Sequence, residues 1–234
     1  PGQLIITRRR GEWQVERRHA EEVIGMLMED PDSLLMVDLA NEPFCEAWRD
    51  VEQLLVRDFL EAIANHLRDK FPDIPLTIGS WGIGKEWRPL WDVDLFAPFL
   101  DVISLHCYLI PRLHTPASHR RMMQDLVAEL ELLDKPVIVS ECCWGSENDG
   151  DRVTLIRHEL GLLRELGLGF FPHALHYSRV ADLHNTDFYW PNLMEMQFIQ
   201  EDGSLRKGHE VYNEFCADQS DFEIWRGVTR KLQL

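Results

Sequence analysis

Short apolar runs alternate with longer amphipathic stretches along most of this chain. The apolar runs are mostly bounded by Pro, Gly or Asp and are often rich in β-branched residues, which is typical of buried β-strands. On this pattern we predict strands at residues 3–7, 34–40, 75–80, 101–108, 135–141 and 170–177.

The longer stretches repeat their apolar residues every three or four positions, which predicts helices with one buried face. In the last of them, for example, Ile156, Leu160 and Leu163 fall on the same face. The predicted helices cover residues 16–29, 48–70, 118–133 and 153–166. Strands that alternate with helices indicate βα units, whose parallel strands are buried on both faces.

Two architectures fit this order, an open doubly wound sheet and a (β/α)8 barrel. An open sheet usually gathers its chemistry at a switch point, often with a Gly-rich phosphate turn, and neither G-x-G-x-x-G nor G-K-S/T occurs here. Instead, polar and aromatic residues follow nearly every predicted strand, where the strands of a barrel converge on one mouth. These residues are Asn41, Glu42, Ser80, Trp81, His106, Tyr108, Glu141, His176 and Tyr177. The sequence therefore predicts a TIM (β/α)8-type barrel.

The composition limits the domain organisation and the partners. With 234 residues and no repeat, linker or composition break, the chain is expected to form a single, partial barrel domain over residues 1–234. The formal net charge of −16 argues against nucleic acid and anionic membranes as partners, because both attract cationic surfaces. No apolar run approaches the ~20 residues that span a bilayer.

The chain has five cysteines, an odd number, and none of them forms a C-x-x-C motif. This pattern is not that of a disulfide framework. Free thiols favour a cytoplasmic location over a secreted protein with its signal removed.

Two glutamates, Glu42 and Glu141, each end a predicted apolar strand. Strands on opposite sides of a barrel mouth can present two carboxyl groups to one central ligand. Cleavage of a glycosidic bond needs this pair, since one acid protonates the leaving oxygen while a second carboxylate attacks the anomeric carbon. A gap of roughly 5 to 5.5 Å between the carboxyl groups predicts a covalent intermediate and retained configuration.

Three motifs surround these glutamates: "ANEP" after one strand, "SLHCY" in another and "VIVSE" in the next. Together they resemble the signature of the clan A glycoside hydrolases, and most closely the cellulase-like enzymes of family 5, over residues 3–215. The resemblance implies that Glu42 is the general acid/base and Glu141 the nucleophile. It also implies that Asn41 binds the sugar 2-hydroxyl, that His106 and Tyr108 line the site, and that the Tyr108 hydroxyl orients the nucleophile.

Four further residues are candidates for substrate binding. Trp81 and Trp144 follow strands, where aromatic rings can stack on pyranose rings, although core or rim packing explains each of them as well. His176 and Tyr177 stand where the family usually places a tryptophan under the reacting sugar. The resemblance implies no metal ligand and no cofactor.

One departure from the family concerns the position of Glu42. The acid/base of this clan follows the fourth strand, yet only 41 residues precede Glu42, against on the order of 100 expected in a ~250-residue barrel. About six βα units can be assigned. We therefore expect the chain to be the C-terminal three-quarters of a barrel, with self-association or a companion segment completing it.

The leading interpretation is a retaining glycoside hydrolase that cleaves β-linked oligo- or polysaccharides by double displacement. One alternative is an inactive or carbohydrate-binding barrel fragment. The other is a metal-dependent hydrolase that uses His106, His173 and His176, for which no H-E-x-x-H spacing is present.

Overall fold

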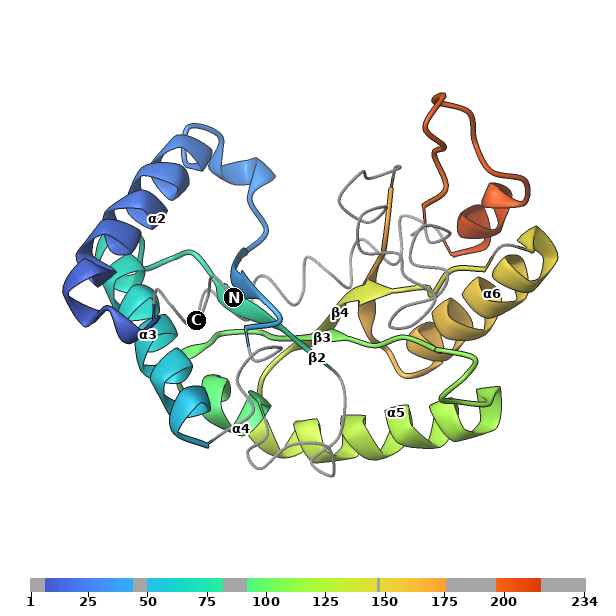
Figure 1. Cartoon of the computed structure of the whole chain (residues 1–234), viewed down its shortest axis with the longest axis horizontal. Coiled ribbons are helices and arrows are strands. Elements are labelled where there is room, and N and C mark those ends of the chain that lie inside the picture. Colours follow the sequence, from blue (N-terminus) through green and yellow to red (C-terminus); the bar gives the residue numbers. More distant parts are fainter. Residues whose placement is uncertain (1–6, 44–49, 82–91, 147, 176–196, 216–234) are drawn as a thin grey trace. The chain divides into compact units, whose positions relative to one another are not determined.

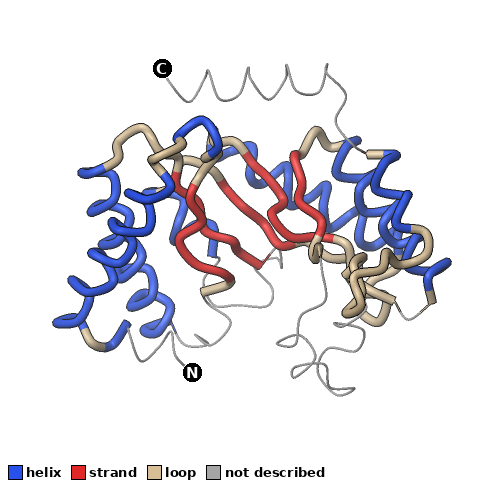
Figure 2. The backbone as a smooth tube through the Cα atoms, turned by 90° about the horizontal axis from the view of Figure 1, so that it is seen from above, coloured by secondary structure: helices blue, strands red, loops and turns tan. Residues whose placement is uncertain are grey.

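A computed structural model describes residues 7–43, 50–81, 92–146, 148–175 and 197–215 of the chain. They include a sheet with the strand order β1-β2-β3-β4-β5, whose strands are drawn in red in Figure 2. The strands are β1 (Val37–Asn41), β2 (Leu76–Trp81), β3 (Ile103–His106), β4 (Val137–Cys142) and β5 (Gly169–Pro172). The pairs β1–β2 and β4–β5 are parallel. Because chain order equals sheet order, every connection passes to the next strand in one direction, as in a barrel.

The helices between the strands are labelled in Figure 1. Before β1 come a short 3₁₀ helix, η1 (Arg10–Glu12), α2 (Trp13–Leu27) and η2 (Pro31–Ser33). The later connections contain α3 (Asp50–Lys70), α4 (Asp92–Phe96), η4 (Ala97–Phe99), α5 (Pro116–Leu130), η5 (Glu131–Leu133) and α6 (Asp149–Glu165), and η7 (His209–Glu214) comes last. None of the helices in the described ranges is long and apolar enough to cross a membrane.

The predicted strands at 34–40, 75–80, 101–108, 135–141 and 170–177 correspond to β1 to β5, and the four predicted helices correspond to α2, α3, α5 and α6. Of the strand predicted at 170–177, β5 covers residues up to Pro172, and the His173 N–H beyond it still donates to the Cys142 carbonyl at 2.9 Å. Residues 176–177 lie outside the described ranges. In the strand predicted at 3–7, only Thr7 is described, and its conformation is helical. The sequence did not predict α4, since its five residues are too few to show a helical period.

The chain folds as two compact units, each with its own core. The first contains residues 1–105 and 130–137. In it, α2 and α3 lie side by side (Figure 1), and Trp13 packs edge-on against Phe59 with ring centroids 5.5 Å apart. Its buried core comes mainly from α3, β2 and the α4–η4 turn: Val56, Leu60, Ile63, Ala64, Leu67, Leu76, Ile78, Phe96 and Phe99. Of the apolar face predicted within residues 48–70 (Val51, Leu55, Phe59, Ala62, Ile63 and Leu67), Ile63 and Leu67 are in this buried core, whereas Val51 is 66% exposed, so the buried face of α3 is only partly the predicted one.

The second unit contains residues 106–129 and 138–228. Its most deeply buried apolar residues come from α5, β4 and α6, including Met123, Leu126, Val139, Ile156, Leu160 and Leu163. α6 begins at a true N-cap, where the Asn148 side chain accepts a hydrogen bond from the Asp151 N–H at 3.0 Å. In the middle of the helix, Arg157 makes two hydrogen bonds to the carboxylate of Glu214 in η7.

Candidate active site

Glu42 directly follows β1 and has an unusual backbone conformation. Its φ is +43°, in the left-handed region that non-glycine residues rarely adopt. The Glu42 N–H donates to the Gly79 carbonyl at 2.9 Å, which ties the residue to β2. Positive φ at a non-glycine residue persists only where the surrounding structure enforces it, and such residues cluster at functional sites.

A β-bulge immediately precedes Glu42. Asp38 is opposite Thr77 and Asn41 is opposite Gly79, so β1 has one more residue than β2 between these pairs. The carboxylate of Asp38 supports the irregularity, because its Oδ1 accepts from the N–H groups of Ala40 at 3.2 Å and Gly79 at 3.0 Å. A bulge of this kind changes the direction of the side chains that follow it.

Glu141 is in β4, and a second bulge surrounds it. Val139 is opposite Phe170 and Cys142 is opposite Pro172, which again leaves one extra residue on the strand that carries the glutamate. The Glu141 carbonyl accepts from the Cys107 N–H at 2.9 Å. Both predicted catalytic residues are therefore next to a bulge, a feature that the sequence did not reveal.

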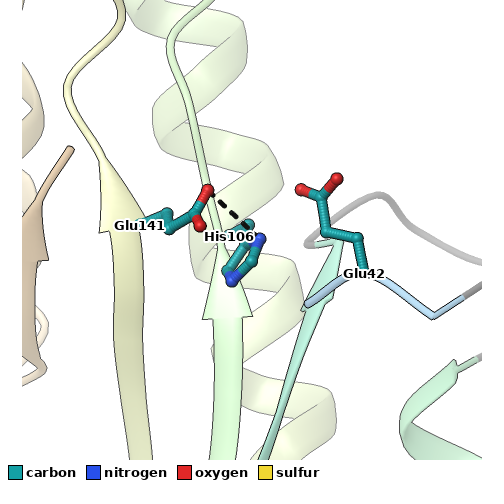
Figure 3. A group of neighbouring side chains, drawn as sticks. All are labelled: Glu42, His106 and Glu141. Atoms are coloured by element: carbon teal, nitrogen blue, oxygen red, sulfur yellow. Dashed lines mark ion pairs between the residues drawn. The ribbon is translucent and has the colours of Figure 1, made fainter. Parts of the chain in front are cut away.

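The Glu141 carboxylate interacts with both residues of the predicted His-x-Tyr pair. The Tyr108 hydroxyl donates to Glu141 Oε2 at 2.7 Å, and His106 Nδ1 lies 3.4 Å from the same oxygen. Figure 3 shows this ion pair between the ends of β3 and β4, and it also shows Glu42 in the segment after β1. The His106 side chain is buried, whereas that of Glu141 keeps about a quarter of its surface exposed (23%). Glu141 is thus held by protein donors and still open to a ligand.

Aromatic rings pack around Tyr108. Trp144 lies edge-on to it with ring centroids 5.5 Å apart, and His173 lies edge-on with centroids 6.4 Å apart. Trp144 and Ile110 are buried, and Tyr108 packs against both. Edge-to-face pairs of this kind fix ring orientation, so the Tyr108 hydroxyl is aimed at Glu141 by its neighbours.

The three cysteines near these strand ends are not nucleophiles. Cys107, Cys142 and Cys143 are buried, and burial raises the pKa of each thiol. The thiol form, which predominates at neutral pH, is a poor nucleophile. In the described part of the chain all three are free of disulfides.

A third carboxylate, Glu159 of α6, lies behind the site with only 1% of its surface exposed. Its Oε1 accepts from the Leu109 N–H, and its Oε2 accepts from the Trp144 N–H at 3.2 Å. Burial raises the pKa of Glu159 to about 8, although the N–H groups of Leu109, Trp144 and Cys143 favour its ionised form. A buried charge needs such partners, since an uncompensated one is very costly.

The remaining predicted residues are placed as follows. Asn41 is the exposed last residue of β1, and Trp81 is the last residue of β2, although its side chain is not described. Trp144 is 5% exposed and packs on Tyr108. His176 and Tyr177 lie outside the described residues.

The alternative metal set of His106, His173 and His176 is only partly described, because His176 is outside the described ranges. Within those ranges, no group of three ligand-type side chains includes His173. His106 and Glu141 are residue types that bind divalent cations. In this structure the Glu141 carboxylate contacts the Tyr108 hydroxyl at 2.7 Å and His106 Nδ1 at 3.4 Å.

Two residues of the site were missed by sequence reasoning, Asp38 and Glu159. Glu159 had a visible signal, since it falls on the apolar face of its predicted helix between Ile156 and Leu160. A carboxylate on such a face is a buried-charge candidate. Asp38 had no such signal, because an acidic residue in a half-exposed strand is ordinary.

Comparisons with known proteins show structural but not sequence similarity. No family model matches the chain, and no curated protein matches it in sequence. Among solved structures, it is similar to an exo-β-1,4-mannosidase from Opitutaceae bacterium strain TAV5, with a TM-score of 0.66 and 19% identity over 92% of this chain and 41% of that chain. It is also similar to a GH53 catalytic domain from Ignisphaera aggregans (TM-score 0.61, 17% identity, 88% and 65% of the two chains). A third is a β-glucuronidase from Faecalibacterium prausnitzii, with a TM-score of 0.62 and 13% identity over 85% of this chain and 34% of that chain.

These similarities confirm the predicted α/β fold of TIM-barrel type, because the chain aligns with glycosidase barrels over most of its length. At identities of 11–19% they show the fold alone. The chain spans less than two thirds of the length of each of these three structures. Assignment to family 5, the single partial domain and the companion segment remain predictions.

Proposed function

We propose that this chain carries the active site of a retaining β-glycosidase, with Glu141 as the nucleophile and Glu42 as the general acid/base. The observation that carries the proposal is the hydrogen bond from the Tyr108 hydroxyl to Glu141 at the end of a parallel strand. The similarity of the fold to glycoside hydrolases supports it. Fold similarity alone would not choose a chemistry, so the argument rests on the residues.

The first step transfers the sugar to the enzyme. A Glu141 oxygen attacks the anomeric carbon, the bond to the leaving oxygen breaks, and Glu42 gives its proton to that oxygen. The Tyr108 hydroxyl donates to Oε2 of Glu141, which leaves Oε1 for the new bond. In the second step the Glu42 carboxylate takes a proton from water, whose oxygen attacks the anomeric carbon and releases Glu141.

This mechanism requires the two carboxyl groups to act on one sugar. Glu42 follows β1 and Glu141 is near the end of β4, two strands of one sheet. The carboxyl ends of parallel strands share one edge, which is where barrel enzymes place their chemistry. The proposal requires roughly 5 to 5.5 Å between the two groups.

The substrate class follows from the proposal and from the similar structures. We propose that Asn41, the exposed residue before Glu42, binds the 2-hydroxyl of the reacting sugar, as the family resemblance implies. A β-glucuronidase and an exo-β-1,4-mannosidase are among the similar structures. We therefore propose a β-linked glycoside of a pyranose sugar, with glucuronide, mannoside, glucoside and galactoside as the substrates to compare.

The experiment that tests this function is covalent labelling. The chain is incubated with 2-deoxy-2-fluoro β-glycosides of the four sugars, and its intact mass is measured before peptide mapping. A single adduct on the Glu141 peptide is the expected result, because the fluorine slows hydrolysis of the glycosyl-enzyme. An adduct on another carboxylate would disprove the assignment of Glu141.

Substitution of each glutamate is the second test. Glu141→Gln and Glu42→Gln should each lower kcat/KM by roughly 10³-fold or more on substrates with a poor leaving group. With a dinitrophenyl leaving group, which needs no proton, Glu42→Gln should leave the first step nearly intact. Glu131→Gln, an exposed glutamate in η5, serves as the matched control and should retain full activity.

Two outcomes would favour the alternatives. Sugar binding without any turnover would indicate a carbohydrate-binding barrel. Activity that EDTA abolishes would indicate the metal-dependent hydrolase instead.

A further inference from the structure

We propose that Glu159 is a positioning residue, which joins the segment after β3 to the segment after β4 and thereby holds Tyr108 on Glu141. The proposal rests on the function proposed above for Glu141. It concerns a residue that the catalytic steps themselves do not use.

The contacts of Glu159 lie on both sides of the Tyr108–Glu141 pair. One carboxylate oxygen accepts from the N–H of Leu109, the residue next to Tyr108. The other accepts from the N–H of Trp144, three residues after Glu141. A single buried side chain therefore fixes both backbones from which the pair extends.

The backbone after β4 is shaped to meet this carboxylate. Cys143 has a φ of +76°, again in the left-handed region, and its backbone N–H favours the ionised form of Glu159. Successive N–H groups around a left-handed residue form a concave site for an anion. The left-handed backbone conformation of Cys143 costs free energy by itself. The interaction with the Glu159 carboxyl group offsets that cost.

The rings complete the connection to the catalytic carboxylate. Trp144, whose N–H Glu159 binds, packs edge-on against Tyr108 at 5.5 Å. The Tyr108 hydroxyl in turn donates to Glu141 at 2.7 Å. Loss of the Glu159 carboxylate would release Leu109 and Trp144 together, and Tyr108 would lose its position through both neighbours.

Glu159→Gln is the substitution that tests this role. The glutamine is the same size, but its NH₂ nitrogen accepts no hydrogen bond, whereas both oxygens of the glutamate can accept one whether the group is ionised or protonated. At least one of the two N–H groups therefore loses its acceptor. The matched control is Glu165→Gln. Glu165 is on the exposed side of the same helix and pairs with Arg120. Thermal unfolding checks that both variants are folded.

The primary measurement is amide hydrogen exchange at Leu109 and Trp144, which needs no turnover. Exchange at one or both of these amides should be at least tenfold faster in Glu159→Gln than in the wild type, and unchanged in Glu165→Gln. The near-UV circular dichroism band that Tyr108→Phe removes should also weaken in Glu159→Gln. Unchanged exchange at these amides in a folded Glu159→Gln variant would overturn the proposal.

Kinetics then separate positioning from mere stability. Glu159→Gln should lower kcat by about tenfold with KM changed by less than about threefold, because the nucleophile and not the binding surface is affected. Added to Tyr108→Phe, it should cause little further loss, since both act on the same hydrogen bond. Full additivity of the two losses would show that Glu159 does not act through Tyr108.

If no glycoside is hydrolysed even by the wild type, the proposed function fails, while the exchange result still decides the role of Glu159.

Discussion

At the scale of single residues, two of the buried titratable groups in the second unit, Glu159 and His119, have pKa values shifted in opposite directions. Burial raises the pKa of Glu159 to about 8. For His119 of α5, burial is the main cause that lowers the pKa to about 4, and the nearby His158 and His114 add to it. In both cases the neutral form is the one that burial favours.

His119 is 1% exposed, and neither ring nitrogen has a hydrogen-bond partner among the described residues. Its ring packs 5.6 Å from that of His158 in α6 and 6.3 Å from that of His114. Burial also lowers the pKa of His114 and of His158, and Arg120 lowers that of His158 further. All three rings are therefore neutral at pH 7, and acid must charge them against this environment.

The expected consequence is acid sensitivity of folding. The folded pKa of about 4 is below the ordinary value of 6.5, so the unfolded chain binds more protons and stability falls as the pH drops from about 6.5 through 4. The full effect is about 3 kcal/mol, from 1.36 kcal/mol per pH unit. His119→Phe should lose less free energy of unfolding between pH 7.5 and 4.5 than the wild type does, measured by urea denaturation. An equal loss in both proteins would contradict the role given to His119.

Glu159 predicts the opposite trend at higher pH. Its folded pKa of about 8 exceeds the ordinary 4.5, so its neutral form stabilises the fold fully below pH 4.5, and this contribution is lost as the pH rises through 8. Glu159→Gln, which cannot ionise, should show a smaller decrease in unfolding free energy between pH 6 and 9. If the wild type and the variant decline in parallel, Glu159 is not the group that titrates.

At the scale of elements, the two bulged strands decide where the glutamates point. A regular β1 or β4 would alternate its side chains strictly, and one extra residue reverses the faces of everything beyond it. In β1 the Asp38 carboxylate provides two of the hydrogen bonds at the irregularity. Removing it leaves two N–H groups without this acceptor.

We therefore expect Asp38→Ala to lower the free energy of unfolding by about 1–2 kcal/mol. It should also lower kcat/KM, because Glu42 follows the bulge directly. Asp32→Ala, an exposed residue of η2, is the control and should change neither quantity. Urea denaturation and the rate on an aryl β-glycoside provide the two measurements. Normal activity in a destabilised Asp38→Ala variant would mean that the bulge does not orient Glu42.

At the scale of the whole molecule, charge is the dominant property. The chain has 40 acidic and 24 basic residues other than histidine, a net charge of −16. Self-repulsion of this size destabilises a compact state, and salt screens it over a Debye length that shortens from roughly 30 Å at 0.01 M to 8 Å at 0.15 M.

The melting temperature should accordingly rise by a few degrees between about 10 and 150 mM salt at pH 7. NaCl and KCl should act alike, because screening does not depend on the identity of the monovalent cation. For a neutral glycoside, KM should stay constant over the same range, whereas a glucuronide should bind better as salt increases. A melting temperature independent of salt would show that the negative charges are too dispersed to matter.

Much of this protein was determined by sequence alone. The periods of residues 48–70 and 153–166 predicted α3 and α6, and the short apolar runs predicted β1 to β5 within a few residues, because burial of one helix face or of a whole strand leaves a local pattern. The same runs ended at Glu42, His106 and Glu141, so the candidate site could be named before its geometry was known. The fold class followed from the order of these elements.

Other features were decided only by tertiary structure. The bulges beside Glu42 and Glu141 depend on which residue of a neighbouring strand is opposite, and no local pattern encodes that pairing. By sequence, Trp144 fitted sugar stacking and core packing equally, and it is buried against Tyr108, because packing between distant segments decides which aromatic side chains remain exposed. Glu159 acquired its partners in the same way, since Leu109 and Trp144 are 50 and 15 residues away in sequence. Patterns along the chain specify which side chains must be buried. Only the folded chain specifies which partners each buried side chain contacts.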